Sequence, residues 1–104
     1  MVVEHALISV TPGREADFEA AFPRAEAVIS QADGFRWAAL TRFVERPSVF
    51  LLLVGWDSVE AHTEGFRGGP LFGPWREVIG PFFAHPPVVE HVTAVSGGIG
   101  PAGG

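Results

Sequence analysis

The stretch that decides the fold is residues 49–62, VFLLLVGWDSVEAH. Its first half is apolar with no polar alternation, which predicts a strand that is covered on both faces. Trp56 follows, and the spacing of Asp57 and Glu60 is typical of a capping box at the start of a helix. We therefore expect a buried strand that passes directly into a helix, and we expect the chemistry of the protein at this junction.

The segments on either side of this stretch carry alternating strand and helix patterns. Short runs rich in branched residues and bounded by Gly or Pro predict strands. Apolar residues at three-and-four spacing, such as Phe18, Phe22, Ala25 and Ile29, predict helices. The expected strands are 2–10, 35–44 and 88–95, and the expected helices are 14–32 and 70–83.

The order strand, helix, strand, strand, helix, strand predicts a ferredoxin-like α+β sandwich, with an antiparallel sheet and both helices on one face. Residues 1–95 are expected to form this single domain, and residues 96–104, nearly all Gly, Pro and Ala, a flexible tail. Two helices can cover only one face of the sheet. Because the third strand is apolar on both faces, a second copy of the chain is expected to cover the other face.

Composition excludes several classes of protein. The chain has 104 residues, 47% of them hydrophobic, a formal net charge of -5 and no Cys. These values exclude a disordered chain, a binder that depends on electrostatic attraction to nucleic acid, a disulfide framework and a thiolate metal site. No apolar run reaches the length of a membrane span and no basic leader precedes the first strand, so we expect a soluble, cytoplasmic protein.

Three side chains near the junction are candidates for chemistry, and each also has a purely structural interpretation. His62 could take a proton as a general base, or it could be a partly buried histidine bonded to a backbone carbonyl. Trp56 could stack on an aromatic ligand and donate its N–H group, or it could be a core residue. Arg76, on a stripe with Phe72, could hold a substrate oxygen or extend to water.

Three motifs resemble one known family. They are VTPGREADFEAAF after the first strand, ADGF before the second, and VGWDSVEAH at the junction. Together they are similar to the antibiotic biosynthesis monooxygenase family of small ferredoxin-like proteins. The resemblance extends over residues 2–95.

The resemblance implies a homodimer whose two sheets pack into a barrel, with a ligand cavity between sheet and helices in each subunit. It also implies oxidation of a planar aromatic or polyketide-like molecule by dioxygen, without metal or organic cofactor. In that reaction Trp56, His62 and Arg76 would be the catalytic residues. The side chains expected to line the substrate cavity are Leu52, Phe66, Phe72 and Trp37. Members of the quinone-forming type have a tyrosine where this chain has His62, and an asparagine where it has Leu52.

Other functions stay open on the sequence alone. A dimeric module that binds a small hydrophobic molecule without turnover, or an oxygen-independent isomerase-like enzyme of the same fold, would use the same cavity. The resemblance implies that haem-degrading members bind iron through a histidine on the later helix. Residues 72–76 contain no histidine, so haem cleavage is disfavoured. His5 and His91 lie on strands expected to be neighbours, but no third ligand stands at a recognisable spacing, so no metal site is predicted.

Overall fold

The computed structural model describes residues 1–99 and has the predicted α+β order. None of its helices has both the length and the apolar character needed to cross a membrane. A short π-helical turn, Ala61–Phe66, precedes the second helix, and a 3-10 turn, Gly80–Phe82, follows it. The strands are β1 (Val2–Ser9), β2 (Phe35–Arg42), β3 (Val49–Trp56) and β4 (Val88–Val92), and the helices are α1 (Glu15–Ile29) and α2 (Phe72–Ile79).

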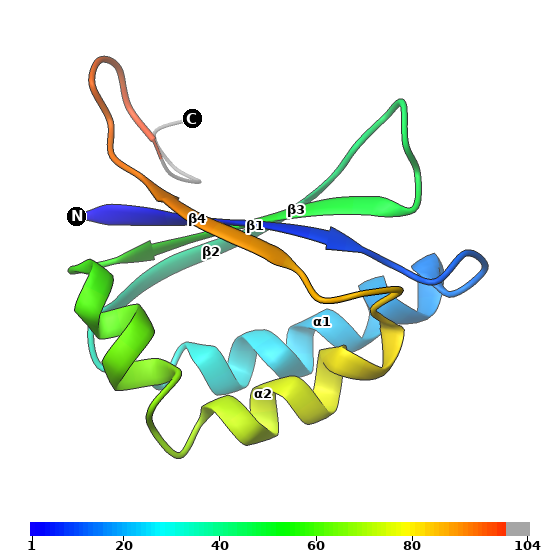
Figure 1. Ribbon diagram of the computed structural model, residues 1–104, viewed down its shortest axis with the longest axis horizontal. Helices are drawn as coiled ribbons and strands as arrows, with labels where there is room; N and C mark the ends of the chain where they lie inside the picture. The colour runs from blue at the N-terminus through cyan, green and yellow to red at the C-terminus, as the bar shows by residue number, and fades with distance from the viewer. Residues whose placement is uncertain (100–104) are drawn as a thin grey trace.

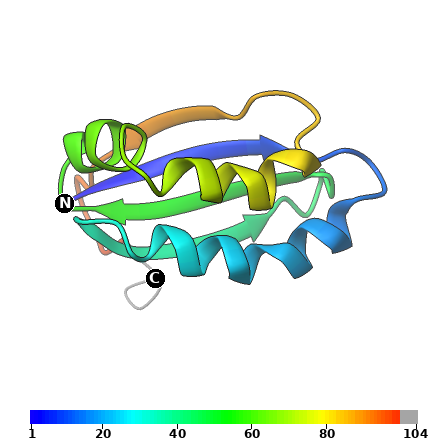
Figure 2. The same cartoon turned by 90° about the horizontal axis from the view of Figure 1, so that it is seen from below.

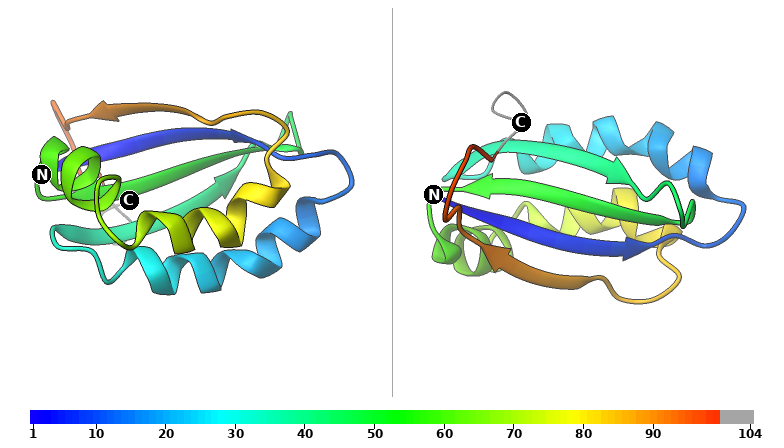
Figure 3. Two further views of the ribbon diagram at one scale, coloured as in Figure 1. Left: turned by 60° about the horizontal axis from the view of Figure 1, so that its bottom comes forward. Right: turned by 90° about the horizontal axis from the view of Figure 1, so that it is seen from above.

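The four strands form one antiparallel sheet in the order β2-β3-β1-β4, with both helices on the same face (Figure 1). Seen from below, α1 and α2 run side by side across the sheet, and from above the sheet lies in front of them (Figures 2 and 3). The predicted ferredoxin-like fold is thus confirmed. The first and last strands are neighbours, so segments from both ends of the chain lie together.

The core lies between the sheet and the two helices. Successive side chains of a strand point to opposite faces, and β3 turns Phe50, Leu52, Val54 and Trp56 toward the helices, each with at most 1% of its surface exposed. Phe18 of α1 packs edge-to-face on Phe50, with ring centroids 4.9 Å apart. The apolar three-and-four stripe of α1 therefore predicts its buried face correctly.

A strict period of two over residues 35–44 would place Phe35 on the same face as Trp37, but β2 departs from that period at its start. The pairing with β3 shifts between Phe35 and Trp37, so Arg36 is an extra residue that breaks the period of two. Phe35 consequently packs with Ala38 against the core on the helix side, although the sequence pattern placed it on the face of Trp37.

The capping box at Asp57 and Glu60 is also wrong. Ser58 is the capping residue, because its Oγ accepts a hydrogen bond from the Ala61 N–H at 3.1 Å. Asp57 instead forms an ion pair with Arg36, whose Nε lies 2.6 Å from Asp57 Oδ1. This ion pair therefore links the bulge at Arg36 to the end of β3.

Several elements are shorter than predicted. Helix α1 ends at Ile29 instead of continuing to Ala32, and β4 ends at Val92 instead of Val95. The predicted helix over 70–83 divides into α2 and the 3-10 turn, because Gly80 and Pro81 do not continue an α-helix. Of the predicted tail 96–104, residues 100–104 lie outside the described part of the chain.

The face of the sheet turned away from the helices is apolar in its centre. Leu51 and Leu53 of β3 and Leu7 of β1 lie on it, each only half-buried. Trp37 covers Gly55 so closely that any side chain at that position would collide with the indole ring. No helix in the described chain covers this face, as Figure 3 shows.

Candidate active site

A cavity of about 340 Å3 lies between the sheet and α2. Its walls come from β1, β3, α2, the π-helical turn and the segment that leads into β4. Most of the wall is apolar and includes the predicted residues Leu52, Phe66 and Phe72. The lining side chains that are charged or can become charged are Glu4, His62, Arg67 and Arg76.

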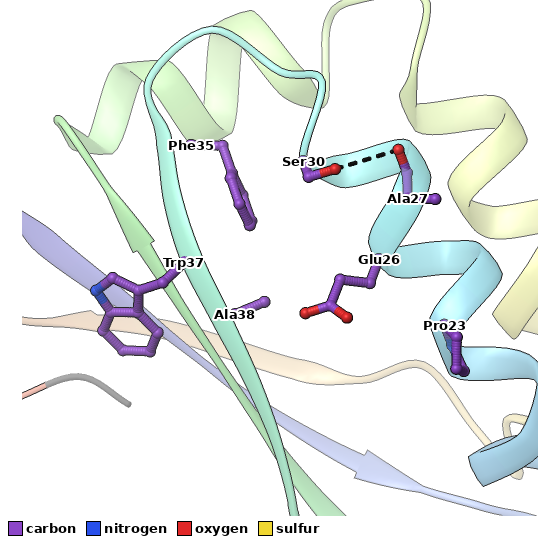
Figure 4. A pocket seen from close by; sticks show the side chains of 7 residues that line it. All are labelled: Pro23, Glu26, Ala27, Ser30, Phe35, Trp37 and Ala38. Carbon is purple, nitrogen blue, oxygen red and sulfur yellow. Dashed lines mark hydrogen bonds between the residues drawn. The ribbon is translucent and has the colours of Figure 1, made fainter. Parts of the chain in front are cut away.

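A second hollow, of about 470 Å3, lies between α1 and β2 and is more open to solvent. Figure 4 shows that Phe35 and Ala38 point toward α1, whereas Trp37 points away from it. The structure therefore places Trp37 apart from the cavity that contains Leu52. Glu26 is the one side chain lining this hollow that can carry a charge.

Glu4 is a carboxylate held in the core. It belongs to β1 and points toward the helices, as do Ala6 and Ile8, and it is only 6% exposed. The indole N–H of Trp56 donates a hydrogen bond to Glu4 Oε1 at 3.0 Å. Burial raises the pKa of the Glu4 carboxyl, and the Trp56 hydrogen bond and the charge of Arg67 offset part of that effect. The carboxyl group of Glu4 therefore holds a proton more readily than an exposed glutamate does.

His62 lies against Glu4 and Trp56 and is 2% exposed. Its ring stacks on the Trp56 ring, with centroids 5.3 Å apart and an angle of 16° between the planes. Nε2 of His62 lies 3.2 Å from Glu4 Oε1. Burial, followed by the charges of Arg67 and His91, lowers the pKa of His62 to about 4, so the imidazole is neutral at pH 7.

The second nitrogen of His62 is also occupied. Nδ1 lies 2.8 Å from Nε2 of His91 on β4, and the tautomers of the two rings decide which of them donates the hydrogen bond. Glu4 and His91 are paired in the sheet register, which brings both to the same side. The result is a continuous polar chain from Glu4 through His62 to His91. We call it the polar end of the cavity.

The π-helical turn sets the position of His62. The Arg67 N–H donates to the carbonyl oxygen of His62, five residues back, at 2.9 Å. Gly68 and Gly69 then pack onto the carbonyl groups of the turn, and a Cβ at Gly68 would lie 2.5 Å from the Glu64 oxygen. Glycine at positions 68 and 69 therefore allows this turn to close.

Arginines lie at the rim. Arg76 is exposed, and its guanidinium carbon lies 5.8 Å from the centroid of the Phe72 ring. Arg67 is also exposed and lines the same cavity. Both can extend toward a negatively charged oxygen at the cavity mouth, whereas the apolar wall cannot.

The structure brings together most of the predicted site residues. His62 and Arg76 line the same cavity as Leu52, Phe66 and Phe72. Trp56 lies behind that wall with 0% exposure, and its N–H is already donated to Glu4. Of the two interpretations of Trp56, this arrangement favours the core residue, because its N–H group is neither exposed nor free.

The sequence analysis did not predict three residues of the site. Glu4 and His91 come from the first and last strands, and Arg67 follows the π-helical turn. The one sequence signal for Glu4 was an acid inside a mostly apolar strand. His5, which the sequence paired with His91, points to the opposite face of the sheet, because successive β1 residues alternate.

Within residues 1–99 no group of three or more acidic, His or Cys side chains is arranged to hold a metal ion.

Comparison with known proteins agrees with this geometry. The family model described as antibiotic biosynthesis monooxygenase matches residues 1–78. The chain belongs to this family. A relative in Bacillus subtilis (strain 168), the uncharacterized protein YczJ, is 38% identical over 91 residues, which are 88% of this chain and 96% of YczJ.

Solved structures of the antibiotic biosynthesis monooxygenase family have the same fold. One from Bordetella bronchiseptica, whose name places it in the family, is 41% identical with a TM-score of 0.89, over 91% of this chain and 97% of that one. SnoaB, a cofactor-independent oxygenase from Streptomyces nogalater, has a TM-score of 0.75 at 21% identity, over 91% of this chain and 93% of its own. At that identity, SnoaB supports the fold alone.

The cavity wall of this member of the antibiotic biosynthesis monooxygenase family departs from the pattern that the resemblance implies for the quinone-forming type. At the positions where the resemblance implies an asparagine and a tyrosine, it has Leu52 and His62, and both line the cavity. Leu52 offers a ligand no polar group, so the polar groups of the cavity wall come from other residues. The structure offers Glu4, His62 and the two arginines.

Proposed function

We propose that this protein is a cofactor-independent monooxygenase that oxidises a planar aromatic or polyketide-like molecule with dioxygen. The observation that carries the proposal is the apolar cavity with Glu4 and His62 at one end. Such a cavity can hold a flat molecule and present an ionisable group to one edge of it. Membership of the family supports the same class of reaction.

The substrate itself supplies the electrons in this reaction, so no resident cofactor is needed. Loss of a proton from a CH2 group beside an aromatic ketone gives a carbanion, which passes one electron to dioxygen, and the two radicals then combine. When the CH2 group has become C=O, one oxygen atom is in the product and the other has left as water with both hydrogens. His62 would assist the proton transfer, and Arg76 would stabilise negative charge on the substrate oxygen.

A non-catalytic binding module is the alternative that one observation favours. Leu52 gives the cavity wall no hydrogen-bond donor where the resemblance implies an asparagine. The same cavity could also serve an oxygen-independent isomerase-like enzyme, in which protons move without dioxygen. Oxygen consumption separates the monooxygenase from both alternatives.

Metal-stripped protein is expected to consume oxygen when supplied with anthrones, naphthols or other polycyclic phenols, and to form the corresponding quinone. An oxygen electrode and product absorbance measure the two quantities together. If tryptophan fluorescence shows that the compounds bind while no oxygen is consumed, the protein is a binding module or an oxygen-independent enzyme.

Replacement of Arg76 by glutamine is expected to lower the rate of oxygen consumption by roughly tenfold to a hundredfold, because the substrate oxygen loses a charged partner. Since Arg76 is exposed, the free energy of unfolding should change by less than about 0.5 kcal/mol. Arg24→Gln is the matched control, because Arg24 is exposed on α1 and does not line the cavity. Equal rates for the two variants would remove Arg76 from the proposed mechanism.

The proposal includes a homodimer formed through the outer face of the sheet, closing a barrel. The half-buried leucines there support it, because a surface of this kind is stabilised when a second copy covers it. Leu53 lies between His5 and Ala39 in the register and so is central to that face.

Leu53→Glu is expected to convert the dimer to a folded monomer, because dimerisation would bury an unpaired charge. Light scattering measures the mass and circular dichroism tests the fold. Val44→Glu, at a residue 87% exposed, is the control and should stay dimeric. A wild-type protein that is monomeric at micromolar concentration contradicts the proposed interface.

A further inference from the structure

The two oxygens of Glu4 have different surroundings. Oε1 accepts the Trp56 hydrogen bond and lies 3.2 Å from His62 Nε2. Oε2 has no hydrogen-bond partner among residues 1–99. In this part of the chain, every fully buried side-chain nitrogen or oxygen has a hydrogen-bond partner. Since Oε2 has none, Oε2 is not fully buried and must reach accessible space. Because Glu4 lines the cavity, we assign that space to the cavity.

His62 is less suited than Glu4 to take a proton from a ligand. Its Nδ1 is held by His91 at 2.8 Å, and its Nε2 lies beside Glu4. Burial lowers the pKa of His62 to about 4, which makes the neutral ring a weak base at pH 7. Burial changes the pKa of Glu4 in the opposite direction, and this brings a carboxylate closer to the range where a general base is effective.

We propose that Glu4, through its free Oε2, is the group that takes a proton from the bound molecule, and that the molecule presents a phenolic or enolic O–H, or the C–H of its keto form, to Glu4. The choice of ligand rests on the proposed function. Trp56 and His62 hold Oε1 and so aim Oε2 into the cavity. Arg67 and Arg76, which line the same cavity, are the cations that the resulting anion would approach.

In the oxygenase reaction Glu4 would act twice in one turnover. The carboxylate first takes a proton from the CH2 carbon, and the carbanion adds dioxygen to give a peroxide anion. Protonated Glu4 returns the proton to the terminal oxygen. The carboxylate then removes the second proton from the same carbon as the O–O bond breaks, and that proton leaves with the hydroxide as water. Glu4 ends in its starting state, and all the electrons come from the substrate.

Anaerobic binding of 4-nitrophenol and 2-naphthol tests the inference separately from oxygenase activity, because the absorbance or fluorescence of each distinguishes phenol from phenolate. Wild-type protein is expected to raise the ionised fraction of the bound probe at fixed pH. Glu4→Gln retains an oxygen for the Trp56 N–H but cannot take the proton. If Glu4 lowers the apparent pKa of the bound probe by about one unit or more, the ratio of phenolate to phenol should be at least about tenfold lower in Glu4→Gln than in the wild type.

Glu64→Gln is the matched control, because Glu64 is an exposed carboxylate on the same π-helical turn. It should ionise the probe as the wild type does. The inference is overturned if Glu4→Gln ionises the bound probe as fully as the wild type, if the wild type binds the probe without ionising it, or if neither probe binds.

If Glu4→Gln does not fold, the wild-type protein decides the question. Carbon NMR of protein labelled at the glutamate carboxyls should show one carboxyl becoming protonated as the probe binds and ionises. Absence of such a signal overturns the inference. If the probe is ionised through Glu4 but no substrate consumes oxygen, the inference stands and the oxygenase proposal fails. In an active oxygenase, Glu4→Gln should slow oxygen consumption by about 10²-fold to 10⁴-fold.

Discussion

Replacement of Trp56 by alanine is expected to lower the free energy of unfolding by about 3–5 kcal/mol, the range found for large aromatic residues in well-packed cores. Trp56 has 0% of its surface exposed and contacts the rings of Phe35, His62 and Phe66. Its removal would leave a cavity among these rings and would also remove the N–H donor from buried Glu4. Both effects act in the same direction.

Trp56→Phe separates the two contributions. It keeps most of the packing but removes the donor, so about 1–3 kcal/mol of the loss should remain if the hydrogen bond to Glu4 matters. Urea denaturation at one fixed protein concentration measures both variants, since a dimer would make the midpoint depend on concentration. Val44→Ala, at a residue 87% exposed, is the control and should change stability by less than about 0.5 kcal/mol. A loss below about 1 kcal/mol for Trp56→Ala contradicts the packing described here.

Acid is expected to destabilise the protein through His62. Its pKa is about 4 in the folded chain and 6.5 ordinarily, so between pH 6.5 and pH 4 the unfolded chain binds a proton that the folded chain does not. The stability that His62 contributes is complete above pH 6.5 and falls as the pH approaches 4. With allowance for solvent screening, the loss is about 2 kcal/mol.

Glu4 acts in the opposite direction. Its pKa is raised in the folded chain, so protonation of Glu4 favours folding at low pH, and that contribution is lost as the pH rises through the raised value. The pH dependence of the free energy of unfolding therefore contains contributions from both His62 and Glu4. Comparison of wild type with His62→Gln isolates the histidine, because the variant has no imidazole to titrate.

Urea titrations at pH 7 and pH 4 should show that the wild type loses about 2 kcal/mol more than His62→Gln over this interval. His85→Gln is the matched control, because His85 is exposed, and it should behave as the wild type does. Parallel losses in wild type and His62→Gln would show that His62 is not the buried neutral imidazole seen in the structure.

The sequence predicted most of the fold because its elements are separated by clear breaks. The order of strands and helices, the buried stripe of α1 and the strand at residues 49–56 all follow from local patterns. The errors lie where a contact distant in sequence overrides the local pattern. At the bulge, Arg36 forms an ion pair with Asp57, which lies 21 residues further along the chain, and Ser58 rather than Asp57 caps the following turn.

The site was predicted only in part, for the same reason. Family resemblance and helical spacing placed His62, Phe66 and Arg76 near one another, and the structure puts all three around one cavity. Nothing local to β1 could show that Glu4 faces inward, because both alternating sets of that strand are largely apolar. The partner of Glu4, Trp56, is known only once the register of β1 with β3 is known.

The central position of β1 in the sheet also has a consequence for synthesis. Glu4 is translated before the other residues of the polar end, and His91 is added only when β4 is made. Until β4 pairs with β1, His62 has no nitrogen partner on its far side and one edge of β1 is open. The nascent chain therefore cannot complete the polar end of the cavity until β4 has been translated and has paired with β1.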